Sequence, residues 1–292
     1  MKSRLVSVII CARNSEETIG ACLDSLTRQT YSPYEIIVVD NASTDATASI
    51  VAGYKTRFER LLCIREEKVA RGAARNAGIR AARGTVIAMT DSDCIVPRNW
   101  LMKITRPILE ENEAVVMGSQ KEVIRNSWSV YEDTTNSNFW KYLIKGKYIL
   151  ILDTKNCAID SDLIKAETFD AGLGTLEDYE LFLRLKGRIK IRFAPEVAVK
   201  HNHPFSPLSL WAHSFERGFW TRCIYEKHKG RKELEGELMM ESMSARSFLS
   251  FPRNILSEFF RVGFSRGIFT LLREAAWRMG IIYRAMSRRK YQ

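Results

Sequence analysis

Two aspartates separated by one residue, Asp91 and Asp93, follow an uncharged run at residues 86–89. The run is partly β-branched, so it is predicted to be a buried strand with both carboxylates at its C-terminal end. In open α/β sheets this edge is where ligands bind. Two hard oxygen donors on one turn can share a divalent cation that also takes phosphate oxygens. Turns favour Asp for local reasons too, so the surrounding elements must decide between a ligand site and a plain turn.

Strands and helices are predicted to alternate over the first 111 residues. Apolar runs predict strands, and apolar residues at helical spacing predict helices between them. We expect strands at 5–11, 35–40, 61–64 and 86–89, and helices after 14, after 45, at 72–82 and at 97–111. Asn14, with Glu17 three residues later, is predicted to cap the first helix. This alternation predicts an α/β fold with a Rossmann-like, mostly parallel sheet flanked by helices.

Three loops follow the C-terminal ends of these strands, after Cys11, after Asp40 and at the aspartate pair. They are expected along one sheet edge, where Asp40 and Asp93 could reach the same ligand. No G-x-G-x-x-G follows the first strand, which argues against a nicotinamide dinucleotide site. A cation together with Arg71 or Arg75, at the start of the third helix, would hold phosphates instead. The alternative for both arginines is a solvated helix charge.

The second half continues the pattern, with strands expected at 114–118, 149–153, 189–193 and 197–199. A glycine-bearing loop at 169–174 precedes Glu177-Asp178 and a helix, and a loop that feeds acids into a cleft suits a general base. The aromatic segment 126–145 is expected to pack in the interior or to form a sugar-stacking wall. His201 and His203 alternate and would share a strand face. Either they are a surface pair, or they ligate the cation expected at Asp93.

Composition is that of a globular protein of one large or two smaller domains, with 292 residues and 46% hydrophobic content. The six cysteines form no CxxC pair, so we expect reduced thiols and a cytoplasmic protein. The first apolar run follows Lys2 and Arg4 but has no small-x-small cleavage site after it. It is therefore predicted to be a strand and not a signal peptide.

Residues 205–292 are expected to form a second, helical and basic extension after a first domain at 1–204. They carry 16 Lys and Arg against 8 Asp and Glu, and so contribute +8 of the net +11. A first helix around 208–220 could close over the site, and a charged linker at 226–241 precedes an arginine-rich apolar segment. Arginines interrupt that segment too often for a membrane-spanning helix. Two hypotheses remain: contact with an anionic membrane surface, or docking on the protein or in a dimer.

The quoted residues resemble family 2 glycosyltransferases, which have the A-type fold and transfer sugars from nucleotide donors. Six motifs match in order over about residues 5–204: Ser7-Val-Ile-Ile with Arg13-Asn14, Val38-Val-Asp-Asn-Ala-Ser-Thr-Asp45, Gly72-Ala-Ala-Arg-Asn-Ala-Gly78, Thr90-Asp-Ser-Asp93, Glu177-Asp178 and His201. One departure is Cys11, because family members commonly carry Pro there. This affects the rigidity of the first loop more than the chemistry.

The resemblance implies a role for each matched residue. Donor contacts would come from Asp40 on the nucleotide base, the loop at Ala12 and Asn14 beside it, Arg71 near the donor, and Asp91 on the ribose or sugar. Asp93 and His201, with His203 as the alternative, would hold Mn²⁺ or Mg²⁺ against the diphosphate. Asp178 would be the catalytic base. Glu177 and Asn156 would lie beside the base or the acceptor.

These roles imply an inverting transfer of a hexosyl or N-acetylhexosaminyl group from a UDP- or GDP-linked donor. The acceptor is expected to be a lipid-linked or cell-surface glycan precursor, as in polysaccharide biosynthesis, at the cytosolic face of the membrane. One rival hypothesis is a nucleotidyltransferase that makes sugar nucleotides, although its Gly-rich basic N-terminal loop is absent. Another is a nucleic-acid-binding protein, prompted by the net charge, but the positive charge accompanies bulky aliphatics and no nucleic-acid motif. We therefore expect no nucleic-acid partner. The oligomeric state stays open.

Overall fold

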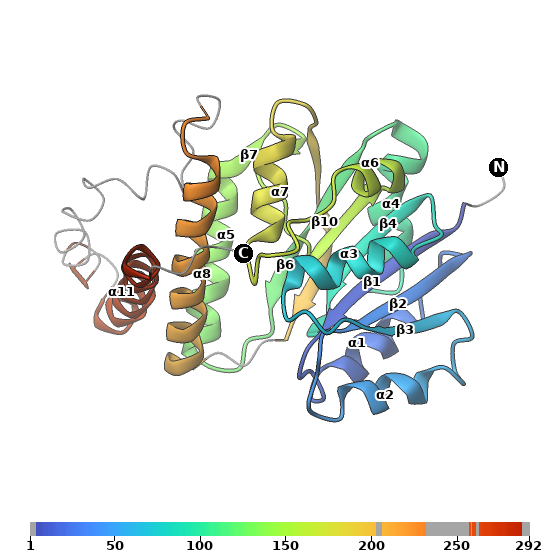
Figure 1. Cartoon of the computed structure of the whole chain (residues 1–292), viewed down its shortest axis with the longest axis horizontal. Helices are drawn as coiled ribbons and strands as arrows, with labels where there is room; N and C mark the ends of the chain where they lie inside the picture. Colours follow the sequence, from blue (N-terminus) through green and yellow to red (C-terminus); the bar gives the residue numbers. More distant parts are fainter. Residues whose placement is uncertain (1–3, 203–205, 232–256, 258, 261–262, 288–292) are drawn as a thin grey trace. The chain divides into compact units, whose positions relative to one another are not determined.

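The computed structural model describes residues 4–202, 206–231, 257, 259–260 and 263–287. The chain forms two compact units, Met1–Val123 with Thr135–His203, and Ile124–Thr134 with Pro204–Gln292 (Figure 1). Residues 124–134, which the sequence assigned to the first domain, therefore group with the C-terminal part of the chain.

A mixed, mostly parallel sheet forms the centre of the first unit. Its ten strands are β1 (Val6–Ala12), β2 (Tyr34–Asp40), β3 (Leu61–Arg65), β4 (Val86–Asp91), β5 (Cys94–Ile95), β6 (Val115–Glu122), β7 (Ile144–Lys145), β8 (Tyr148–Ile149), β9 (Asn156–Asp160) and β10 (Ile191–His201). They are ordered β3-β2-β1-β4-β9-β6-β10-β8-β7, and β5 pairs with β10. The longest ladders, β6 with β10 and β1 with β2, are parallel, whereas β9 runs antiparallel between β4 and β6.

Helices cover both faces of this sheet, as the alternating pattern predicts. The helices that precede α8 in the sequence are α1 (Ile19–Leu26), α2 (Thr47–Tyr54), α3 (Arg71–Ala81), α4 (Trp100–Glu111), α5 (Ser127–Leu143), α6 (Ser161–Ala166) and α7 (Glu177–Leu185). Helices α1, α2 and α4 build one core with Val8 and Ile10 of β1. Helix α3 packs on the other face, where a Cβ at Gly78 would clash with Ile9, so glycine lets α3 approach the sheet closely.

Register sets which residues meet at the carboxyl edge. Buried on both faces, β1 and β2 have the near-continuous apolar sequences that parallel strands require. Ala12 lies opposite Asp40, and Cys11 lies opposite Asp91. The ends of β1, β2 and β4 therefore lie side by side, as the sequence predicted.

Several boundaries differ from the sequence predictions. Helix α1 begins at Ile19 after Thr18, so the predicted cap at Asn14 is wrong. The expected strand at 149–153 is reduced to β8, which ends at Ile149. The two strands expected at 189–199 are one strand, β10, whose register with β6 shifts between Ala194 and Ala198. Pro195 lies in that interval and cannot donate to the ladder, which accounts for the irregularity.

The second unit centres on α8 (Pro207–His228) and α11 (Phe264–Met286). The two helices approach closely at two glycines, because a Cβ at Gly218 would clash with the Trp277 backbone and one at Gly280 with the Phe215 backbone. Trp128, in the part of α5 that belongs to this unit, lies 6.0 Å from the Phe269 ring, centroid to centroid. None of the described helices combines the length and the apolar character needed to cross a membrane.

Candidate active site

The first two loops at the carboxyl edge are tied together by hydrogen bonds. The Asn41 N–H donates to the Ala12 carbonyl at 2.8 Å, and the Thr44 N–H donates to Asn14 Oδ1 at 2.9 Å. Asn14 and Ala42 have φ angles of 48° and 54°, a left-handed conformation that is rare outside glycine. The two loops are thus held in a defined shape next to the end of β1.

Asp40 ends β2 and is 2% exposed. Its Oδ2 pairs with Arg65 Nη1 at 2.8 Å, and its Oδ1 accepts the Ser43 N–H at 3.1 Å. Arg65, at the end of the neighbouring strand β3, was not among the predicted site residues. Its position one strand away from an acid at a strand end is the signal that would have found it.

Arg75 of α3 joins three other parts of the chain at the carboxyl edge: the end of β4, the segment before β9, and α7. Its Nη2 lies 3.1 Å from Asp91 Oδ1 and donates to Thr154 Oγ1, and its Nη1 lies 2.7 Å from Glu177 Oε1. Burial disfavours the charge, but Glu177 and Asp91 outweigh it and raise the pKa of Arg75. With 6% of its side chain exposed, Arg75 forms a clamp between two acids, Asp91 and Glu177.

Asp178 lies in the first turn of α7, two residues after Leu176, whose φ of 62° turns the chain into the helix. Its Oδ2 accepts from the Thr154 N–H at 3.4 Å. Burial, followed by the charges of Glu177 and Asp153, raises the pKa of Asp178 to about 6. Asp178 therefore titrates close to neutral pH, which suits a group that takes up and releases a proton.

Glu177, predicted to neighbour the base, is itself 2% exposed, and its Oε2 has no hydrogen-bond partner among the described residues. Its other oxygen holds Arg75. Glu177 thus acts on Asp178 through charge and through the clamp.

Asp93 and His201 lie together, although 108 positions separate them in the sequence. His201 Nε2 is 3.2 Å from Asp93 Oδ2, and Nδ1 is 2.8 Å from Glu122 Oε2. Burial opposes the imidazolium, but the hydrogen bonds to Asp93 and Glu122 raise the pKa of His201 to about 10. Glu122 was missed by the sequence analysis and lies opposite His201 in the β6–β10 ladder.

These residues fit a divalent cation. Asp93 Oδ2 and His201 Nε2 are spaced as two adjacent ligands of one ion, and the carboxylate on the other ring nitrogen is the usual outer partner of a ligating histidine. Among the described residues no group of three or more His, Cys, Asp or Glu side chains is arranged to hold a metal. Substrate oxygens would therefore have to complete the coordination. His203 lies outside the described residues.

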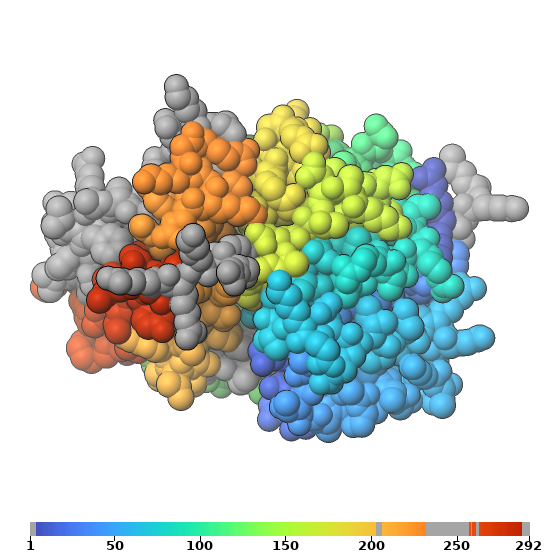
Figure 2. Space-filling model, viewed as in Figure 1, coloured from blue at the N-terminus to red at the C-terminus, as the bar shows by residue number. Residues whose placement is uncertain are grey.

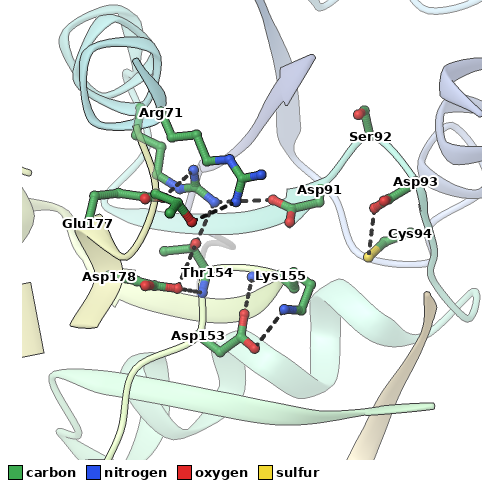
Figure 3. Close-up of polar contacts among 12 residues, drawn as sticks. Arg71, Asp91, Ser92, Asp93, Cys94, Asp153, Thr154, Lys155, Glu177 and Asp178 are labelled. Carbon is green, nitrogen blue, oxygen red and sulfur yellow. Dashed lines mark hydrogen bonds and ion pairs between the residues drawn. The ribbon is translucent and has the colours of Figure 1, made fainter. Parts of the chain in front are cut away.

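Asp153 and Lys155 are a further pair that the sequence analysis did not single out (Figure 3). Lys155 Nζ lies 3.1 Å from Asp153 Oδ2, and 25% of the lysine side chain is exposed. Burial disfavours the ammonium charge, yet Asp153 and Asp91 raise the pKa of Lys155. The sequence signal for this pair is two opposite charges, Asp153 and Lys155, spaced i, i+2 just before the strand β9.

Asn156, which was predicted to neighbour the base or the acceptor, forms hydrogen bonds within the protein through its side chain. It is 2% exposed and accepts from Trp100 Nε1 at 2.8 Å. Its amide donates to the Ser119 and Val197 carbonyls at 2.6 and 2.7 Å. All of its polar atoms are used to join β6, β9 and β10 around Gly118, so its role is structural.

Arg71 lies at the edge of the cluster, where its Nη1 donates to Thr175 Oγ1 at 3.2 Å, ahead of α7. The loop before α7 packs on α3, because the Asn76 amide exchanges two hydrogen bonds with the Phe169 backbone at 2.8 and 3.0 Å. Figure 2 shows this loop beside α3 on the visible face. Within the aromatic segment, Trp140 meets Phe193 edge-on at 6.2 Å between ring centroids, whereas Phe139 and Tyr142 are exposed.

Residues 7–166, more than half of the chain, match the family described as glycosyl transferase family 2. The chain belongs to this family. It is 32% identical over 190 residues to UDP-Glc:alpha-D-GlcNAc-diphosphoundecaprenol beta-1,3-glucosyltransferase WfgD of Escherichia coli, covering 63% of this chain and 71% of WfgD. It is 32% identical over 166 residues to glycosyltransferase AglE of Haloferax volcanii, covering 55% of this chain and 54% of AglE. The chain thus spans about half the length of AglE.

Among solved structures, this family 2 glycosyltransferase superposes on the mannosyltransferase PcManGT from Pyrobaculum calidifontis, in complex with GDP-Man and Mn²⁺, with a TM-score of 0.72. The match covers 99% of this chain and 89% of PcManGT at 17% identity. This likeness confirms the predicted glycosyltransferase A-type fold.

Proposed function

We propose that this family 2 glycosyltransferase transfers a hexosyl or N-acetylhexosaminyl group from a UDP- or GDP-linked donor to an acceptor hydroxyl, with inversion and with a divalent metal. What carries the proposal is one arrangement at the carboxyl edge of the sheet. The Asp93–His201 pair and the partly buried base Asp178 both adjoin the Arg75 clamp, through Asp91 and Thr154 respectively. A metal ligand pair and a base with a raised pKa are the two parts that such a transfer requires.

In this mechanism Asp178 accepts the proton of the acceptor hydroxyl as that oxygen forms a bond to the anomeric carbon. The bond between the anomeric carbon and the diphosphate oxygen breaks on the opposite face, and the nucleoside diphosphate leaves. Asp93 and His201 would hold Mn²⁺ or Mg²⁺, which would supply Lewis acidity to neutralise the diphosphate charge. One displacement inverts the stereocentre, so an α-linked donor gives a β-linked product.

The remaining donor contacts follow from the loops. Asp40 faces the nucleotide base from the end of β2 and keeps its orientation through Arg65 and the Ser43 N–H. The loop of Ala12 and Asn14 lies beside it, and Asp91 orients the ribose or sugar while Arg75 fixes its carboxylate.

A panel of nucleotide sugars tests this function. We expect one UDP- or GDP-sugar to raise the thermal unfolding midpoint with Mn²⁺, because a ligand that binds only the folded state stabilises it. The same sugar should be transferred to a glycan or lipid-linked acceptor. Nucleoside triphosphate plus sugar 1-phosphate serves as the control for the nucleotidyltransferase alternative. Stabilisation and turnover by that pair alone would contradict glycosyl transfer.

For the acceptor we propose a lipid-linked or polysaccharide precursor, met at the cytosolic membrane face. WfgD is named as a glucosyltransferase that acts on GlcNAc-diphosphoundecaprenol, and this supports a lipid-linked acceptor. In the second unit, α11 presents an exposed apolar stripe at helical spacing, formed by Phe264, Leu271, Met279, Ile282, Tyr283 and Met286. The buried Arg284, by contrast, points to α8, with its Nε 3.0 Å from Cys223 Sγ. An amphipathic helix of this kind can lie in the lipid interface.

Liposome flotation tests the membrane contact. We expect the Met279→Glu, Ile282→Glu double variant to lose most of the binding of the full chain, because two charges are placed in the apolar stripe. Ala212→Glu and Ser265→Glu, at other exposed positions of α8 and α11, form the charge-matched control and should float like the parent. Equal flotation of both double variants would contradict membrane binding through the apolar stripe. If the Met279→Glu, Ile282→Glu variant instead disrupted a dimer, the stripe would be assigned to contact with a second copy of the chain.

A further inference from the structure

The diphosphate of the donor needs a cationic partner besides the metal, and of the two arginines predicted for it, Arg71 and Arg75, the second is engaged by the protein. Arg75 directs both terminal nitrogens at protein acceptors, and its side chain is 6% exposed. The carboxylates of Asp91, Asp93 and Asp178 would repel a phosphate group. Some other positive group must offset this repulsion if a diphosphate is to bind.

Lys155 has the position and the unused donors for this task. An ammonium has three N–H donors, and across the described residues Asp153 is the one acceptor found for Nζ, at 3.1 Å. Asp153 is held in turn, since its Oδ1 accepts the Lys155 backbone N–H at 2.9 Å. One carboxylate therefore holds the ammonium in place. Its remaining N–H donors can bind a ligand that reaches the exposed part of the side chain.

The surroundings of Lys155 are those of the reacting groups. Figure 3 shows its side chain between Asp153 and the turn that carries Asp91 and Asp93. Its charge acts on Asp91, Asp178 and His201, the residues assigned to the sugar, the base and the metal. Lys155 directly precedes β9, and Asn156, the first residue of β9, pairs with Thr90 of β4. The sheet thus places Lys155 next to the end of β4, where the aspartate pair begins.

We propose that Lys155 binds a phosphate oxygen of the substrate in the active site and so supplies positive charge that the sequence analysis expected from Arg71 or Arg75. The proposal rests on the proposed glycosyl transfer. Two substrates can supply this chemistry: the diphosphate of the nucleotide donor, or a phosphate on a lipid-linked acceptor. A structural ion pair with Asp153 would by itself leave substrate binding unchanged when Lys155 is replaced.

Titration calorimetry of Lys155→Met with Mn²⁺ tests the donor source. We expect the affinity for UDP or GDP to fall roughly tenfold while the affinity for the matching nucleoside changes little, since a charge-assisted hydrogen bond to phosphate is lost. Lys155→Arg keeps the charge and should recover part of the affinity. Lys165→Met, an exposed lysine of α6, is the matched control and should bind like the parent.

The acceptor source is tested with a short-chain prenyl diphosphate sugar and its phosphate-free analogue. If the acceptor supplies the phosphate, Lys155→Met weakens binding of the diphosphate form alone and leaves donor affinity intact. Unchanged affinity for both diphosphates would overturn the proposal, and an unfolding midpoint within a degree or so of the parent excludes a folding defect. Failure of the parent protein to bind any nucleoside diphosphate would instead overturn the proposed function, and this inference with it.

Discussion

The Asp178→Asn variant is expected to lose sugar transfer by roughly 10²- to 10⁴-fold, the range of a general base, while nucleotide binding persists. The amide keeps the shape of the side chain but cannot accept the acceptor proton. Because burial and neighbouring acids raise the pKa of Asp178 to about 6, the folded state is destabilised by its ionisation above that pH. The variant should therefore be at least as stable as the parent at pH 7.5. Single-turnover transfer and donor calorimetry measure the two properties.

The same pKa predicts the acid limb of the pH profile. Asp178 must be ionised to act, so the transfer rate of the parent should fall about tenfold per pH unit below about 6 and level off above it. Asp162→Asn, an exposed acid of α6, is the control and should keep rate and profile. Unchanged turnover in Asp178→Asn would remove Asp178 from the mechanism.

The Asp93→Ala variant is expected to lose the metal-dependent part of donor binding, by roughly tenfold or more in affinity. Two protein ligands face the proposed ion, and removing Asp93 Oδ2 leaves His201 Nε2 with no carboxylate beside it for the metal. Mn²⁺ binding, followed by electron paramagnetic resonance with and without nucleotide, measures this directly and needs no turnover. Nucleotide affinity in the parent with chelator should match that of Asp93→Ala without it.

A graded effect is expected at Glu122→Gln. Glu122 contacts His201 Nδ1 at 2.8 Å and holds the ring toward Asp93, so its loss should weaken Mn²⁺ affinity by about 10- to 100-fold without changing the ligands.

Asp162→Ala is the charge-matched control for Asp93→Ala. If Mn²⁺ affinity in Asp93→Ala equalled that of the parent, the metal would have to be assigned to other residues.

Local patterns in the sequence were enough to predict β1, β2 and β4 and the sheet edge at which the site forms. Apolar runs that end in acids specify buried parallel strands, and register then brings Ala12, Asp40 and Asp91 together, because strand ends in parallel ladders share one edge. This information is local. It needs only the composition of each run and the order of the runs.

The partners of the charged side chains, by contrast, depend on contacts that form in the folded chain. Arg75 forms an ion pair with Glu177 of α7, and His201 contacts Glu122, which is 79 positions away in the sequence. No local sequence pattern predicts either contact. Asn156 turned inward because the antiparallel insertion of β9 between β4 and β6 placed its amide among backbone carbonyls that needed donors. Burial of a charge demands a partner, and which partner is nearest depends on the order of strands in the folded sheet, not on spacing in the chain.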